Sequence, residues 1–236
     1  MAAWFLGLAL ASCQPGPSTE GTPTSSTDAT VSYQPNYAEN FWIQNTDGGK
    51  LLYLTPFQDS PDTLVFGLYP SSQPQPQLPE KITPISTPIE SVVALSATHV
   101  GMLGAIGQTQ TIVGLSHPEY IYHPQVRERL QSGEVEDVGV EGGLNREQLL
   151  VMQPNLIMAS VMSAAGHAKD FGALQKAGIA VLPNAEWTEP SVLGRAEWMV
   201  AIAALYGQQE QAERRFSQID SAYQSLAELE IGRAHV

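Results

Sequence analysis

Four short segments of the chain combine side chains suited to holding a small molecule. Each follows a stretch rich in aliphatic residues, and together they offer hydroxyl, imidazole and aromatic groups. Pockets for large, partly apolar ligands use this mixture. The segments are residues 96–99 (SATH), 116–120 (SHPEY), 160–163 (SVMS) and 184–187 (NAEW). The candidate ligand contacts within them are Ser96, Thr98, His117, Tyr120, Ser160, Met162 and Trp187.

Each candidate also has a structural explanation. A serine that follows a strand often caps the next helix. Tyr120 and Tyr122 are suited to anchoring a loop, and Trp187 to packing beneath a neighbouring helix. The sequence leaves both explanations open at every position.

The sequence lacks the motifs of a catalytic or metal site. G-x-S-x-G, H-E-x-x-H and C-x-x-C are absent, and no element carries paired carboxylates for acid–base chemistry. Gly101 and Gly104 fall within a predicted helix that stops at Gly107, so they do not form a phosphate-binding turn. We therefore expect no catalysis, no cofactor and no metal. The histidines, none spaced as a metal-binding pair on one helix, include His99, His117, His123 and His167.

Strands and helices alternate from residue 92 onward. This alternation predicts an α/β fold, a mostly parallel sheet covered by helices. Parallel strands end at one edge of a sheet, where ligands bind, so the four candidate segments should meet there. The predicted strands are 92–95, 112–115, 137–140, 156–159 and 179–182, and the predicted helices are 96–107, 124–132, 145–153 and 169–177.

The preceding part of the chain predicts strands only. They cover residues 41–43, 50–55, 63–68 and 81–85. The turn cluster at 45–49 (NTDGG) predicts a hairpin between the first two. We assign residues 33–190 to one α/β lobe.

Residues 191–207 (SVLGRAEWMVAIAALYG) predict a helix with Ser191 as its N-cap. Nearly every residue from 198 to 206 is apolar, and a helix that is apolar all round is buried on more than one side. It is too short for a bilayer, which needs about 20 apolar residues. We interpret it as an internal spine with something packed on each flank. Residues 208–229 predict a last helix with one apolar stripe.

The N-terminus has the features of a targeting signal. Residues 4–11 (WFLGLALA) have the length of a signal-peptide core, and residues 10–13 (LASC) resemble the bacterial lipobox. We therefore predict a signal peptide at 1–13, with Cys13 lipidated. Residues 14–32 are rich in Pro, Gly, Ser and Thr and predict a disordered tether.

Charge and the C-terminus give two further expectations. The net charge is −13, from 24 acids and 11 bases, which argues against a nucleic-acid partner. Residues 231–236 (IGRAHV) resemble the translation of a sequencing adapter, so we expect a non-native tail and a natural protein that continues beyond about residue 230.

A loop at residues 142–148 (GGLNREQ) leads into a predicted helix. Asn145 and Gln148 have the spacing of a capping box. Glu147 lies in the first turn, where the helix dipole favours an acid. A purely stabilising role would explain all three residues.

Several segments resemble one family, the periplasmic substrate-binding proteins of ABC importers for ferric siderophores and cobalamin. The resemblance covers about residues 82–229 and is most specific at 149–157 (LLVMQPNLI), where a helix leads through Pro-Asn into a strand. It includes 112–116 (IVGLS) and 174–179 (LQKAGI), and the lipobox and tether are typical of the family.

The resemblance implies two α/β lobes of the class III type, joined by one long helix, with ligand held between the lobes. Residues 191–207 would be that interlobe helix, 208–230 would be the first helix of the second lobe, and the rest of that lobe would be missing. Family members dock each lobe on the permease through a surface glutamate that faces a permease arginine. Glu147 falls at the matching position of the first lobe.

We therefore predict a lipid-anchored protein of the periplasm or cell envelope that captures a ferric siderophore or corrinoid and delivers it to ABC permease subunits. Two alternatives remain open. One is a zinc- or manganese-binding protein of similar architecture that uses His99, His117 and His167. The other is an α/β enzyme with its active site at the same edge of the sheet.

Overall fold

The computed structural model describes residues 31–233, with positions 141 and 161 left out. Cys13, the predicted signal peptide and most of the predicted tether lie outside the described residues, as do residues 234–236. The predicted α/β fold is confirmed by a five-stranded sheet, which we call sheet B, whose strands are all parallel. Its strands are β6 (Val92–Ala94), β7 (Ile112–Leu115), β8 (Glu136–Asp137), β9 (Leu156–Ala159) and β10 (Ala180–Pro183).

The strand order in sheet B is β10-β9-β6-β7-β8. The chain starts in the centre at β6 and moves outward through β7 to β8. It then returns to the other side of β6 for β9 and β10. In doubly wound sheets the connections diverge at such a reversal, which leaves a crevice at the carboxyl ends of the two central strands. Here that crevice is expected between the ends of β6 and β9.

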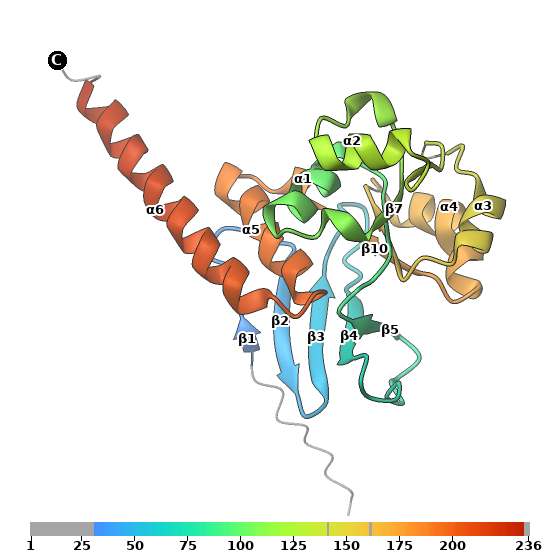
Figure 1. Ribbon diagram of the computed structural model, residues 1–236. Helices are drawn as coiled ribbons and strands as arrows, with labels where there is room; N and C mark the ends of the chain where they lie inside the picture. Colours follow the sequence, from blue (N-terminus) through green and yellow to red (C-terminus); the bar gives the residue numbers. More distant parts are fainter. Residues whose placement is uncertain (1–30, 141, 161, 234–236) are drawn as a thin grey trace, which may run out of the picture.

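Helices cover both faces of sheet B (Figure 1). Leu156 and Met158 of β9 belong to one hydrophobic cluster, while Ile157 and Ala159 belong to another, as expected for alternating side chains in a strand. The first cluster includes side chains of α1, α2 and α5, and the second includes side chains of α3 and α4. The helices are α1 (Ala97–Ala105), α2 (Pro124–Gln131), α3 (Arg146–Met152), α4 (Ala164–Lys176), α5 (Val192–Ala204) and α6 (Gln209–Arg233).

Local signals explain where the predicted boundaries shift. α4 begins at Ala164 rather than at residue 169, because the Ser163 hydroxyl caps it by accepting from the Gly166 N–H at 3.0 Å. β8 ends at Asp137 rather than at residue 140, because Gly139 has a φ of 81° and leaves the extended conformation.

A second five-stranded sheet, sheet A, precedes sheet B in the chain, with the order β1-β2-β3-β4-β5. Neighbours are antiparallel except β4 and β5, which run parallel. The predicted hairpin is confirmed, since Thr46 of β2 pairs with Gly49 of β3. Sheet A starts inside the range expected to be tether, at Val31. Its strands are β1 (Val31–Tyr33), β2 (Phe41–Thr46), β3 (Gly49–Leu54), β4 (Leu64–Pro70) and β5 (Ile82–Thr87).

α5 is the buried helix that the apolar run predicts, with Ser191 as its cap. One flank packs on sheet A, where the Trp198 ring lies 5.4 Å from the ring of Phe41. Other sides contact α1 and α6. Residues of this lobe therefore surround the helix already, and its apolar circumference does not require a second lobe.

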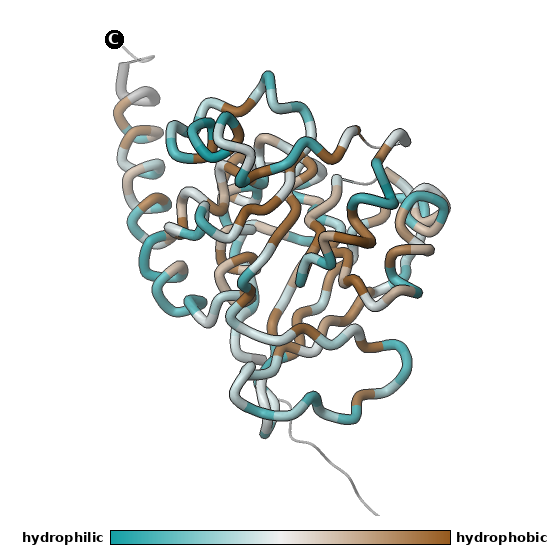
Figure 2. Tube along the Cα trace, turned by 45° about the vertical axis from the view of Figure 1, so that its right-hand side comes forward, coloured by the Kyte–Doolittle hydropathy of each residue, from teal (hydrophilic) through white to brown (hydrophobic). Residues whose placement is uncertain are grey.

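α6 follows directly and is the long, projecting element (Figures 1 and 2). Its first turns are held to the body through the buried side chains of Ala212 and Phe216. The apolar stripe then becomes exposed, and its exposed members are Ile219, Tyr223, Leu226 and Leu229. Among the described residues, no helix is both long enough and apolar enough to cross a membrane.

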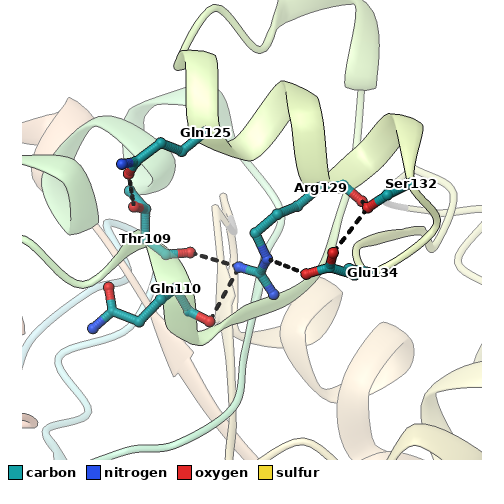
Figure 3. Close-up of polar contacts among 6 residues, drawn as sticks. All are labelled: Thr109, Gln110, Gln125, Arg129, Ser132 and Glu134. Atoms are coloured by element: carbon teal, nitrogen blue, oxygen red, sulfur yellow. Dashed lines mark hydrogen bonds and ion pairs between the residues drawn. The ribbon is translucent and has the colours of Figure 1, made fainter.

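A polar cluster around Arg129 of α2 joins this helix to the segment that precedes β7 (Figure 3). The Arg129 guanidinium donates to the carbonyl oxygens of Thr109 and Gln110 at 3.0 and 3.1 Å, and to the Glu134 carboxylate at 3.2 Å. The two carbonyls belong to the 3-10 helix η1 (Thr109–Thr111), which leads into β7. The end of α2 is thus tied to the start of β7.

Candidate functional site

A pocket of about 350 Å³ lies at the carboxyl edge of sheet B. Its walls come from the segments that follow β6, β9 and β10, so it lies where the strand order reverses. The structure therefore brings five of the seven candidates together, and their contact with a ligand stays a prediction. The predicted residues that line the pocket are Ser96, Thr98, Ser160, Met162 and Trp187.

A chain of hydroxyls forms one wall of this pocket. Ser96 caps α1 by accepting from the Thr98 N–H at 3.3 Å, so the structural explanation for this serine also holds. The Thr98 hydroxyl donates to Glu186 Oε1 at 2.7 Å. The Ser96 and Thr98 hydroxyls lie 2.9 Å apart. Because the single Thr98 proton is used on the carboxylate, Ser96 is the donor in that contact.

Glu186 also lines the pocket, and the candidate contacts omit it. Its side chain comes from the 3-10 helix η3 (Glu186–Thr188) after β10 and is only 4% exposed. Oε2 is buried without a hydrogen-bond partner among the described residues. Burial raises the pKa of the Glu186 carboxyl, and the Thr98 hydroxyl and the backbone near residues 186 and 187 offset this rise only in part. A carboxylate after a buried strand, within segment 184–187, was the available sequence signal.

His99 contacts Ser160 of the pocket wall but does not itself line the pocket. It is fully buried, and its Nε2 lies 3.2 Å from the Ser160 hydroxyl oxygen. Burial lowers the pKa of His99 to about 3, so the ring is neutral at physiological pH. A neutral ring in contact with Ser160 is a positioning element for the β9 segment rather than a charged ligand contact.

Two predicted contacts do not line the pocket. His117 and Tyr120 lie on the segment after β7, on the opposite side of β6 from β9 and β10. Both side chains are exposed, and their rings are 5.7 Å apart. His117 has the left-handed backbone conformation, with a φ of 53°. The strand order, which the sequence does not reveal, separates these two residues from the other five.

The histidines of the metal alternative are dispersed. His99 is on α1, on one face of sheet B, whereas His167 is on α4, on the other face, where it packs between Phe57 and Phe171. His117 pairs with Glu119 at 3.2 Å. Within the described part of the chain, no group of three or more His, Cys, Asp or Glu side chains is placed to hold a metal ion.

Glu147 is exposed in the first turn of α3, beside a surface hollow of about 390 Å³. It makes no ion pair with any described residue. The cap is confirmed, because Asn145 Oδ1 accepts from the Gln148 N–H at 3.1 Å. The reciprocal half of the capping box does not form: the Gln148 side chain donates to Glu136, and the Asn145 N–H donates to Val138.

A sequence model of the family described as periplasmic binding protein matches residues 92–229, more than half of the chain. The chain belongs to the periplasmic binding protein family. The match begins at β6 and ends within α6, so it covers all of sheet B and the whole pocket. Proteins of this family bind solutes.

This periplasmic binding protein is also similar to parts of several longer proteins. An uncharacterized lipoprotein of Methanocaldococcus jannaschii is 25% identical over 142 residues, which span 58% of this chain and 34% of the relative. Among solved structures, the vitamin B12 binding protein BtuF of Vibrio cholerae is 22% identical with a TM-score of 0.45, covering 59% of this chain and 50% of that one.

A heme-binding protein of Pseudomonas aeruginosa is 19% identical with a TM-score of 0.47, covering 59% of this chain and 46% of that one. The present chain thus spans about half the length of these solved structures and about a third of the curated relative.

Proposed function

We propose that this chain is the first lobe of a substrate-binding component that captures a ferric siderophore or a cobalamin-type ligand and delivers it to an ABC importer. The main support is that five predicted ligand contacts, from three separate segments, line one pocket. This pocket lies where the strand order of sheet B reverses. The proposed role is binding without chemistry.

The second lobe is also part of the proposal. The sequence favours residues 191–207 as the connection between lobes, yet α5 is enclosed within this lobe. α6 suits the connection better, because it projects and carries an exposed apolar stripe from Ile219 to Leu229. A partner body packed on that stripe would remove it from water.

Glu147 is the proposed contact with the permease. It begins the helix that follows β8, so it lies toward the same edge of sheet B as the pocket. A carboxylate without an internal ion pair is available for a permease arginine, and such pairs fix orientation. Membrane attachment through lipidated Cys13 completes the proposal, and Cys13→Ser should release the protein from membranes on fractionation.

Ligand capture is tested by fluorescence on the full-length protein with three probes: a ferric trishydroxamate, a ferric triscatecholate and cyanocobalamin. At least one should quench tryptophan emission, because Trp187 lines the pocket. Trp187→Phe should remove most of the quenching. Trp42→Phe is the matched control, since Trp42 stacks on Tyr53 in sheet A, 4.9 Å between ring centroids. Absence of binding by all three probes would reject the proposed ligand classes.

Delivery is tested separately by uptake of the probe that binds. Glu147→Ala should lower uptake while capture remains unchanged. Glu210→Ala removes the same charge from an 86% exposed side chain of α6 and should leave both unchanged. Equal uptake by the Glu147→Ala variant and the unmodified protein would contradict the docking role.

A further inference from the structure

Two hydroxyls and one carboxylate form a chain of hydrogen bonds along one wall of the pocket. The hydroxyl protons run in one direction, from Ser96 to Thr98 and from Thr98 to Glu186. Both protons are therefore committed to internal contacts. Each hydroxyl oxygen already accepts one hydrogen bond, Ser96 from the Thr98 N–H and Thr98 from Ser96, and keeps one further lone pair. Such a wall attracts donors and repels anionic groups.

Charge reinforces this preference. Glu186 is the charged residue among the described pocket-lining side chains, and neither Lys nor Arg occurs among them. The nearby Arg195 is exposed on the first turn of α5 and donates its Nε to the Glu189 carbonyl oxygen at 3.3 Å. No described cation forms an ion pair with Glu186, although the charge of Arg195 is near enough to lower the pKa of its carboxyl against the larger effect of burial.

Burial makes this carboxylate costly without a partner. Glu186 is only 4% exposed, and one of its carboxylate oxygens has no donor among the described residues. An unpaired buried charge costs far more than a paired one. The other buried glutamates, Glu189 and Glu197, are satisfied by neutral donors of the protein itself. At Glu186 a cationic donor supplied from the pocket would satisfy the group and offset its charge.

We propose that Glu186 is the specificity-determining residue of this half of the cleft, and that it selects ligands bearing a positively charged ammonium group. Thr98 and Ser96 orient the carboxylate toward that group through their hydroxyl relay. Within the classes proposed above, the inference favours a cationic chelate over an anionic catecholate or carboxylate chelate. The preference among chelates rests on the proposed function, whereas the preference of the pocket for an ammonium group does not.

The test uses the full chain with two probes that differ in one charge: ferrioxamine B, a ferric trishydroxamate with a terminal ammonium, and its N-acetylated form. The unmodified protein should bind the ammonium form at least about tenfold more tightly, the effect of one charge-assisted hydrogen bond. Glu186→Gln should abolish the preference, and Glu210→Gln should retain it. Equal binding of both probes, or preference for the acetylated form, overturns the inference whether or not the variant folds.

A second measurement separates this inference from the proposed function. n-Butylammonium, a minimal probe, should shift the NMR signal of the Trp187 indole N–H in the unmodified protein, and n-butanol should not. If no chelate binds but the ammonium shift occurs and is lost in Glu186→Gln, the chelate function fails while the pocket inference stands. If chelates bind without any ammonium preference, only the pocket inference fails.

Discussion

Buried glutamates at two places in this protein have opposite surroundings. At the junction of α5 with sheet A, Glu197 is fully buried and accepts from the Tyr33 hydroxyl at 2.7 Å and from three backbone N–H groups at 2.8 Å. Glu189 is 1% exposed and accepts from backbone groups, the Asn40 amide and the Trp198 indole. At the pocket, Glu186 accepts from Thr98, and its Oε2 has no hydrogen-bond partner within the part of the chain that the structure describes.

This difference separates structural from binding carboxylates. A carboxylate whose lone pairs are filled by the protein fixes two segments together and has nothing left for a ligand. One with an unpartnered oxygen lowers stability and can still accept a hydrogen bond from an added donor. Glu197 and Glu189 join residues 36–40 to the region of α5, which explains how sheet A is attached to the rest of the lobe.

The largest effect is expected at the structural junction. Glu197→Ala leaves three buried or partly buried N–H groups without their acceptor, which should lower the free energy of unfolding by roughly 3–5 kcal/mol. Urea unfolding followed by circular dichroism measures this change. Glu210→Ala, at an exposed position, should change it by no more than about 0.5 kcal/mol. A loss below about 1 kcal/mol at Glu197 would mean that the junction does not depend on this carboxylate.

A smaller effect is expected when one donor to Glu189 is removed. Trp198→Phe deletes the indole N–H that lies 2.7 Å from Glu189 Oε1 and leaves a gap beside Phe41. The unfolding free energy should fall by about 2–3 kcal/mol. Trp42→Phe, on sheet A but without a buried carboxylate partner, should cost less than about half of that. Equal losses would show that volume alone, rather than the hydrogen bond, matters at Trp198.

The smallest effect is expected at the pocket, with the opposite sign. Folding raises the pKa of Glu186. Between the unfolded and the folded pKa, the folded protein therefore binds more protons at this group than the unfolded chain does. The free energy of unfolding then falls as the pH rises through the folded pKa. Glu186→Gln does not titrate. Melting temperatures of the variant and the unmodified protein should therefore diverge in favour of the variant as the pH rises above 4.5, the ordinary pKa of a glutamate. A difference that shrinks with rising pH would contradict this assignment.

Much of the lobe follows from the sequence. The alternation of apolar strands with capped helices predicts the parallel sheet, because local hydrogen bonding and hydrophobic period are set by nearby residues. Ser96, Asn145 and Ser191 cap their helices as their positions predict. The segments that could carry a site also follow, since parallel strands must end at one edge.

The tertiary structure decided which of those segments meet. Strand order depends on packing between distant segments, and it placed β9 and β10 on one side of β6 and the segment with His117 on the other. It also decided what surrounds α5. Apolar residues on all sides of a helix predict that the helix is buried, but they do not predict which elements bury it, here sheet A, α1 and α6. The roles of the glutamates were fixed in the same way: Glu186, Glu189 and Glu197 are chemically identical, and only their neighbours in space distinguish them.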